Sequence, residues 1–156
     1  MRISPEEVTA ALHRFGLERD RLRTALARHL GIAVADLDAL EHLELAGPLS
    51  QRDLAERLLL SSGAVTFLVD RMEQAGLVQR QPHPTDRRAT LVTLAPAAKL
   101  PEVPELNQYH KAIRREAAQL SATGGSAVAG FLSAVTAQAA SATAELQQRK
   151  PRRPRG

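Results

Sequence analysis

A change of hydrophobic period constrains the fold of this chain most. Up to residue 76, apolar residues recur at the three- and four-residue spacing of helices, and glycines interrupt the pattern. Residues 77–81 and 90–94 then alternate apolar and polar side chains as strands do, and a polar segment with two prolines separates them. The sequence therefore predicts a mainly α fold that contains a small β-hairpin.

The helical stretches have recognisable starts and stops. Ser4, followed by Pro5 and two glutamates, is typical of a helix start, and Gly31 ends this first helix after about Leu30. Further helices are expected at residues 35–46, 51–59, 62–75, 105–120 and 126–148. In the fourth helix we expect four residues to face inward: Val65, Leu68, Val69 and Met72.

Composition excludes several classes of function. The chain has 156 residues and no cysteine, which rules out disulfides, thiolate metal sites and cysteine-based redox sensing. We find no apolar stretch long enough to span a bilayer and no signal peptide at the N-terminus. A soluble cytoplasmic protein is expected.

The net charge of +4 is a poor guide to function. Residues 149–155 carry five of the 21 basic side chains, and the remainder holds 16 basic and 17 acidic residues. The part expected to fold is thus nearly neutral, and residues 149–156 are expected to form a disordered basic tail. A case for nucleic-acid binding must therefore rest on where charges lie.

Residues 49–94 carry the functional signal: a helix, a tight turn, a second helix and a hairpin, the layout of a helix-turn-helix with a wing. Leu59 stands in the turn where many such units have glycine, so we expect a longer turn or a negative φ there. Small and hydroxyl residues at the start of the second helix suit insertion into a DNA major groove. The predicted contact residues are Ser61, Ser62, Gly63, Thr66, Phe67, Asp70 and Arg71, with Gln74 on the same face.

The hairpin tip adds a second candidate contact. Arg87 and Arg88 follow Asp86 at a turn between Pro84 and the second strand, and an arginine on a narrow arm fits the negative potential of a minor groove. We interpret Asp86 as a structural residue that orients an arginine. The alternative is a solvated turn whose charges protect a sheet edge.

The stretches Leu49–Ala55, Val65–Thr66, Val69–Arg80 and Pro84–Leu94 resemble the MarR family (multiple antibiotic resistance regulators). The resemblance covers the central third of the chain and implies a homodimer that binds a pseudo-palindromic operator, with repression as the default effect. It implies that the second helix enters the major groove and that Arg88, with Arg87, enters the minor groove. The implied organisation is an N-terminal dimerisation helix (1–34), the winged helix-turn-helix (35–96) and C-terminal dimerisation helices (97–148). Members usually continue into one long helix after the hairpin, which Pro101 and Pro104 interrupt here.

Many MarR-like proteins also bind a small aromatic or anionic effector that releases the DNA. The candidate pocket residues here are Leu12, His13, Phe15, Leu40 and Tyr109, of which Leu12 and Phe15 fit a plain core role better. No pair of the five histidines has ligand spacing on a helix face, so no metal site and no cofactor are expected.

Two other classes remain as alternatives. A small helical enzyme lacks support, because no glycine-rich phosphate loop and no Ser/His/Asp set is present. A non-specific DNA-coating protein would use the arginine-rich tail as its main contact.

Overall fold

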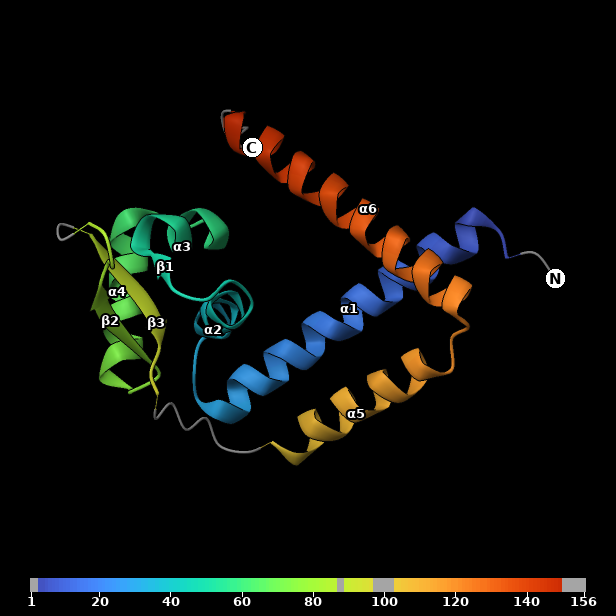
Figure 1. Ribbon diagram of the computed structural model, residues 1–156, viewed down its shortest axis with the longest axis horizontal. Coiled ribbons are helices and arrows are strands. Elements are labelled where there is room, and N and C mark those ends of the chain that lie inside the picture. The colour runs from blue at the N-terminus through green and yellow to red at the C-terminus, as the bar shows by residue number, and fades with distance from the viewer. Residues whose placement is uncertain (1–2, 87–88, 97–102, 150–156) are drawn as a thin grey trace, which may run out of the picture. The chain divides into compact units, whose positions relative to one another are not determined.

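The computed structural model describes residues 3–86, 89–96 and 103–149 (Figure 1). The chain divides into two compact units, Met1–Pro101 and Glu102–Gly156, called here the N-terminal and C-terminal units. Arg87, Arg88 and Pro101 lie outside the described residues, as does the basic tail from Lys150 onward.

The described residues of the N-terminal unit form four helices, α1 (Pro5–Leu30), α2 (Val34–Ala46), α3 (Gln51–Leu58) and α4 (Ser62–Gln74). Each confirms a predicted helix to within a residue or so. At the start of α1 the Ser4 side chain accepts from the Glu7 N–H at 3.2 Å, and the Glu7 carboxylate accepts from the Ser4 N–H at 2.8 Å. This reciprocal cap satisfies two N–H groups that the helix itself cannot. Gly31 ends α1 with φ 68°, in the left-handed region.

A three-stranded antiparallel sheet completes this unit. The predicted hairpin is confirmed as β2 (Val78–Pro82) and β3 (Thr90–Leu94), paired from Val78↔Leu94 to Pro82↔Thr90. The sequence did not predict β1 (Leu49–Ser50), which pairs with the other edge of β3 through Leu49↔Val92. A strand of two residues is too short to show the alternation of apolar and polar side chains. It nevertheless connects the start of α3 to the wing by pairing with β3.

One apolar cluster joins the helices to the sheet. The four residues predicted to face inward from α4 are all buried, which confirms that stripe. Burial of each such side chain contributes about 1.5–3 kcal/mol. Around them pack Ala39, Leu40, Leu43, Leu49, Leu54, Leu77, Val78 and Val92.

The turn between α3 and α4 departs from expectation at Leu59. Its φ of 57° and ψ of 36° are left-handed, so the expected longer turn or negative φ is wrong. The Leu59 N–H donates to carbonyl oxygens of the last turn of α3, and the Leu60 N–H reaches back to Ala55 O at 3.0 Å. These bonds fix the tight turn and hold Leu59 in a conformation that costs a non-glycine residue roughly 1–2 kcal/mol.

The C-terminal unit consists of α5 (Pro104–Ala118) and α6 (Ala122–Gln148). Both helices were predicted, α6 with a start four residues later. Ser121 caps α6 by accepting from the Gly124 N–H at 3.1 Å. None of the described residues of this unit is buried.

The expectation that no apolar stretch is long enough to span a bilayer is wrong for helix α6. By length and composition alone, its 27 residues are apolar enough to cross a bilayer. The reason is that residues 122–144 contain no charged side chain, although serine, threonine and glycine are spread among the apolar ones. One such helix is weak support for a membrane location, since helices that pack against protein have the same composition.

Candidate nucleic-acid interface

The first turn of α4 is built to present backbone and hydroxyl groups to solvent. Ser61 caps the helix, and its hydroxyl accepts from the Ala64 N–H at 3.3 Å. Ser62 and Gly63 follow and are exposed. Because the first N–H groups of a helix have no partner within it and carry the positive end of the dipole, this turn suits a phosphate.

Most residues of the predicted contact set are exposed on the outward face of α4. Thr66, Phe67, Asp70 and Gln74 are exposed, and Phe67 keeps 67% of its surface accessible. Arg71 differs, because it is half-buried on the flank of the helix. The face therefore offers hydroxyl, amide and aromatic groups along its length.

Arg80 of β2 holds one flank of α4. Its guanidinium bonds Asp70 at 2.5 Å and also bonds Glu73, whose carboxylate accepts from the Arg80 N–H at 3.1 Å. Burial alone would lower the pKa of Arg80, but its bonds to Asp70 and Glu73 more than offset this and raise the pKa above its ordinary value. The guanidinium therefore stays charged and ties α4 to the wing.

Gln51, the first residue of α3, extends this network. The Thr66 hydroxyl donates to Ser62 O at 2.9 Å, so its oxygen is left to accept from the Gln51 amide at 3.2 Å. In that orientation the Gln51 oxygen accepts from Arg80 Nη2 at 3.0 Å and from Nε at 3.1 Å. One network therefore connects α3, α4 and β2.

The sequence reasoning missed Arg80 and Gln51 as residues that support the interface. A signal existed for Arg80, because it lies two residues after the buried Val78 and pairs in register with the buried Val92. An arginine on the inward face of a strand needs an acidic partner.

On the other flank of α4, Arg71 bonds the carboxylate of Asp36 in α2. Its guanidinium carbon lies 5.3 Å from the centroid of the Phe67 ring, within the range of a cation–π contact. In this structure the charged ends of Asp70 and Arg71 are thus both paired within the protein. Their contact with DNA stays a prediction.

The described part of the wing is organised by His83. Its Nδ1 accepts from the Thr85 N–H at 3.3 Å and from the Asp86 N–H at 3.2 Å. The backbone closes the tip through bonds of 3.0 Å from the His83 N–H to Ala89 O and from the Ala89 N–H to Asp86 O. Asp86 is exposed next to Arg87 and Arg88 in the sequence, whose predicted minor-groove role falls outside the described residues.

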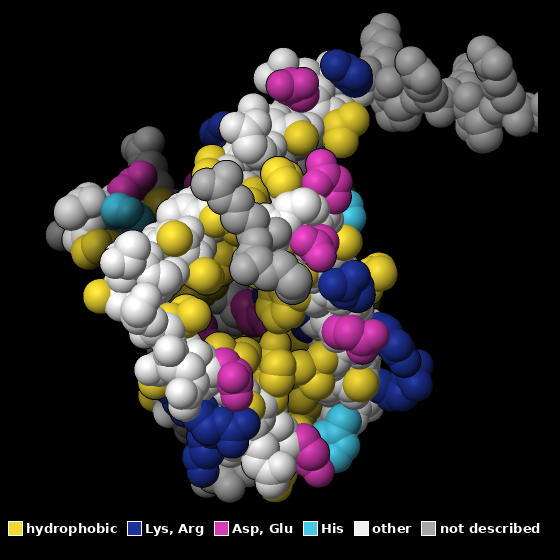
Figure 2. Space-filling view, turned by 90° about the vertical axis from the view of Figure 1, so that its right-hand side faces the viewer, with side chains coloured by type: hydrophobic (Ala, Val, Ile, Leu, Met, Phe, Trp, Pro, Cys, Tyr) yellow, Lys and Arg dark blue, Asp and Glu magenta, His cyan; other side chains and the backbone are white. Residues whose placement is uncertain are grey.

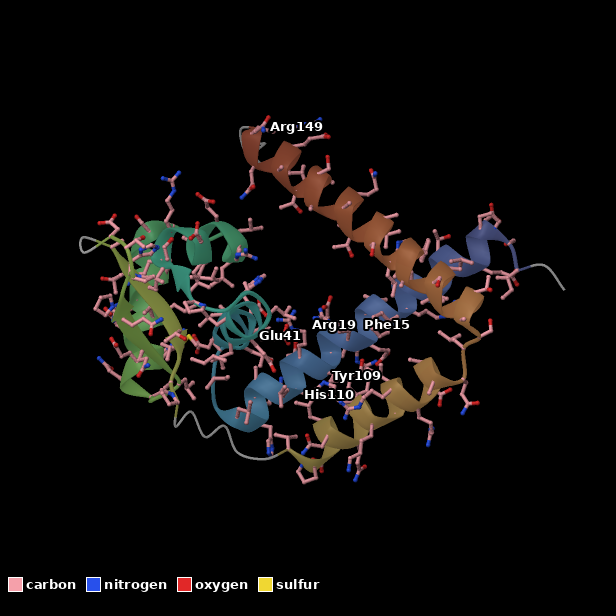
Figure 3. The ribbon with its side chains drawn as sticks, in the orientation of Figure 1. Phe15, Arg19, Glu41, Tyr109, His110 and Arg149 are labelled. Carbon is pink, nitrogen blue, oxygen red and sulfur yellow. The ribbon has the colours of Figure 1, made fainter. Side chains whose placement is uncertain are left out.

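Ion pairs connect α1 with α2 (Figure 3). Arg19 and Arg23 both approach Glu41, at 3.5 and 3.3 Å, and Arg23 also bonds Asp38. Burial, together with the charges of Arg57 and Arg23, lowers the pKa of the adjacent His42 despite the opposing effect of Glu41.

The predicted pocket residues fall in different environments. Leu40 belongs to the core, with 6% of its surface exposed, whereas Leu12 is half-buried. His13 is exposed on α1, and so is Phe15, with 51% of its surface accessible, so the core role expected for Phe15 is wrong for the single chain. Tyr109 lies in the C-terminal unit with its ring centroid 5.8 Å from that of His110. Their role in binding an effector stays a prediction.

Comparison with known proteins finds a similarity over the helix-turn-helix region. Residues 24–89 match the model of the MarR family. The HTH-type transcriptional regulator YcgE of Bacillus subtilis, itself called uncharacterized, is 41% identical over 75 residues. That alignment covers 48% of this chain and 49% of YcgE, so the chain spans about half the length of the curated relative that it matches.

Solved structures show the same fold over a greater length. The transcriptional regulator Tm0710 of Thermotoga maritima superposes with a TM-score of 0.60 at 23% identity, over 89% of this chain and 98% of that one. A point mutant of MepR from S. aureus, solved bound to an oligodeoxyribonucleotide, gives 0.52 at 15% identity over 88% and 99%. Helices α3 and α4 and strand β2 lie within the matched residues 24–89, and over this segment the chain is similar to the MarR family.

Proposed function

We propose that this protein is a transcriptional regulator that binds double-stranded DNA sequence-specifically, as a homodimer on a pseudo-palindromic operator. The observation that carries the proposal is the outward face of α4, where Ser62, Gly63, Thr66 and Phe67 stand exposed beside the wing. MepR, which shares this fold, has been solved with an oligodeoxyribonucleotide.

The chemistry of this face suits base reading. A helix in the major groove distinguishes base pairs through hydrogen bonds and through the thymine methyl group. Thr66 supplies a hydroxyl, Phe67 an apolar ring and Gln74 an amide, while the first turn of α4 directs N–H groups toward phosphate. Ser61, Asp70 and Arg71 border this surface, and Asp86, Arg87 and Arg88 would extend it into the adjacent minor groove.

The uncovered apolar side chains of the C-terminal unit support the proposed homodimer. In α5 and α6 no described residue is buried, and the apolar side chains of α6 lie largely along one face. On the face that Figure 2 views, hydrophobic side chains are accessible among polar and charged ones. Helices this long need a packed face to be stable in water, and a second copy supplies a matching one. The side chains concerned are Ile113, Leu120, Val128, Phe131, Leu132 and Leu146.

Further parts of the proposal rest on the family. Repression is the default effect, release by a small aromatic or anionic effector is the proposed control, and the cytoplasm is the proposed location. A regulator is favoured over an enzyme because the matched proteins are named as regulators.

The proposal is tested by selecting bound duplexes from a random pool with the full-length protein. We expect one enriched sequence, bound at moderate salt in the presence of random competitor. Thr66→Ala and Phe67→Ala should each weaken binding to it by about 1–3 kcal/mol with little change for random DNA. Arg88→Ala should cost a similar amount. Equal binding to every duplex would contradict the proposal.

Truncation after Gln148 separates this function from DNA coating by the tail. Removing residues 149–156 should weaken binding to all sequences alike and lower the salt slope by up to about five phosphate contacts. Loss of the sequence preference itself would instead place specificity in the tail.

A further inference from the structure

Asp36, in the first turn of α2, is the one charged or polar residue that the described part of the chain buries, with 2% of its surface exposed. Its Oδ2 accepts from the Ala33 N–H at 3.0 Å, and its Oδ1 accepts from Nη2 of Arg71 in α4. A buried carboxylate is tolerated when both of its oxygens are paired. Asp36 therefore depends on Arg71, which lies 35 residues away in the sequence.

Arg71 is held in turn from two sides. The carboxylate of Asp36 bonds one end of its guanidinium, and the Phe67 ring lies 5.3 Å from the guanidinium carbon. Its Nε is buried and meets no hydrogen-bond acceptor within the described residues. The Arg71 side chain keeps 42% of its surface exposed, so it has room to turn outward when the Asp36 carboxylate is removed by substitution.

Each charged side chain of α4 thus has a partner inside the protein. Asp70 and Glu73 bond Arg80 on one flank, and Arg71 bonds Asp36 on the other. Flank positions of a helix that lies in the major groove face the phosphates along the groove walls. An unpaired arginine there would bind phosphate in any sequence.

We propose that Asp36 is a positioning residue that limits sequence-independent DNA binding by holding Arg71 away from phosphate. The inference rests on the proposed DNA-binding function. Random sites in a genome vastly outnumber operators, so weaker binding to random DNA leaves more protein for the operator. Asp36 therefore acts on selectivity without contacting DNA.

The test compares Asp36→Asn with Asp38→Asn in the full-length protein. Asp38 is on the same helix, is paired with Arg23 of α1 and changes the net charge equally when replaced by asparagine. The probes are a labelled random-sequence duplex of about 30 base pairs and the duplex selected by the wild type. With Asp36→Asn, affinity for the random duplex should rise roughly three- to tenfold and the salt slope should steepen by about 0.9, the value of one phosphate contact.

Asp38→Asn should change neither the affinity for the random duplex nor the salt slope beyond a small effect of net charge. An equal rise in both variants would overturn the proposal, because net charge alone would explain it. The double variant Asp36→Asn/Arg71→Gln should return both quantities to the wild-type values, since the freed guanidinium is then absent.

The single variant Arg71→Gln gives an independent test, because the introduced glutamine amide can still donate to the Asp36 carboxylate. The salt slope of DNA binding by this variant should equal that of the wild type. A slope lower by one contact would show that Arg71 binds phosphate and that Asp36 orients it, which overturns the proposal.

Whether each of these variants folds is checked separately. The asparagine introduced by Asp36→Asn keeps an oxygen for the Ala33 N–H, and thermal unfolding checks each variant. If Asp36→Asn does not fold, Arg71→Gln carries the test by itself. A wild type that binds no DNA would remove the proposed function and this inference together, whereas binding by the wild type with no difference between the asparagine variants would remove this inference alone.

Discussion

The two units of the chain follow the same local rules but differ in what they bury. Ser61 caps α4 as Ser121 caps α6, and each helix starts directly after its capping serine. Yet α4 buries a complete stripe against the sheet and its neighbouring helices, whereas the described residues of α5 and α6 bury nothing. Local sequence specifies a helix in both units, but among the described residues it is those of the N-terminal unit that bury a complementary surface.

The largest effect is expected from breaking the core of the N-terminal unit. Leu68 is 2% exposed, and Leu68→Asp would bury an unpaired carboxylate among apolar side chains. The free energy of unfolding should fall by more than about 4 kcal/mol, a large part of the total for a small domain. Chemical denaturation measures this. The control Gln74→Asp, on the exposed face of the same helix, should cost less than about 1 kcal/mol, and equal losses would contradict the assigned core.

The second-largest effect is expected in the C-terminal unit. A charge introduced on its apolar face should dissociate the two chains of the proposed homodimer without unfolding the N-terminal unit. Phe131 is 37% exposed in the single chain. Phe131→Asp should weaken the proposed homodimer by about 2–4 kcal/mol, as expected for an aromatic residue at an interface centre. Sedimentation measures the mass. Ser133→Asp, an exposed position on the side of α6 that faces away from Phe131, is the control. A dimer of unchanged stability with Phe131→Asp would place the interface elsewhere.

A smaller effect is expected where the wing and α4 are fastened together. Arg80→Gln leaves Asp70 and Glu73 without their cation, and we expect a loss of about 1–2 kcal/mol in stability and a similar loss in operator affinity. The control is Arg52→Gln, because Arg52 pairs with Glu56 at 3.1 Å on an open surface. That pair should contribute less than about 0.5 kcal/mol. Equal effects of the two changes would show that the Arg80 network adds nothing beyond a surface pair.

The smallest effect should be a gain. Leu59→Gly relieves the left-handed backbone and should raise stability by up to about 1 kcal/mol, because glycine reaches this conformation without strain. Gly31→Ala is the reciprocal change at φ 68° and should lower stability by a similar amount. Thermal unfolding compares the two. A loss of stability with glycine at position 59 would show that the exposed leucine side chain matters more than its backbone.

Most of the fold could be predicted from the sequence, because caps, glycines and periodicity are local signals. Ser4, Gly31 and the inward stripe of α4 show this. Two features could not be predicted because they have no local signal in the sequence. Strand β1 is only two residues long, and the positive φ of Leu59 results from hydrogen bonds within the turn.

The candidate interface could be predicted only in part. Helical period identified the outward face of α4. The pairs that hold its flanks, Asp36 with Arg71 and Arg80 with Asp70, join residues 35 and 10 positions apart and arise only when α2 and β2 pack on α4. Periodicity gives no sign of such contacts, so the sequence predicted Arg71 as a DNA-contact residue and not as the partner of Asp36.

The most direct test of the account is the arrangement of half-sites in the duplexes that the full-length protein selects, together with the number of chains bound to each. Two copies of α4 related by symmetry should select an inverted repeat with half-site centres about 10 base pairs, or one helical turn, apart, and two chains should bind each duplex. A single half-site bound by one chain, or no enriched sequence at all, would contradict the account.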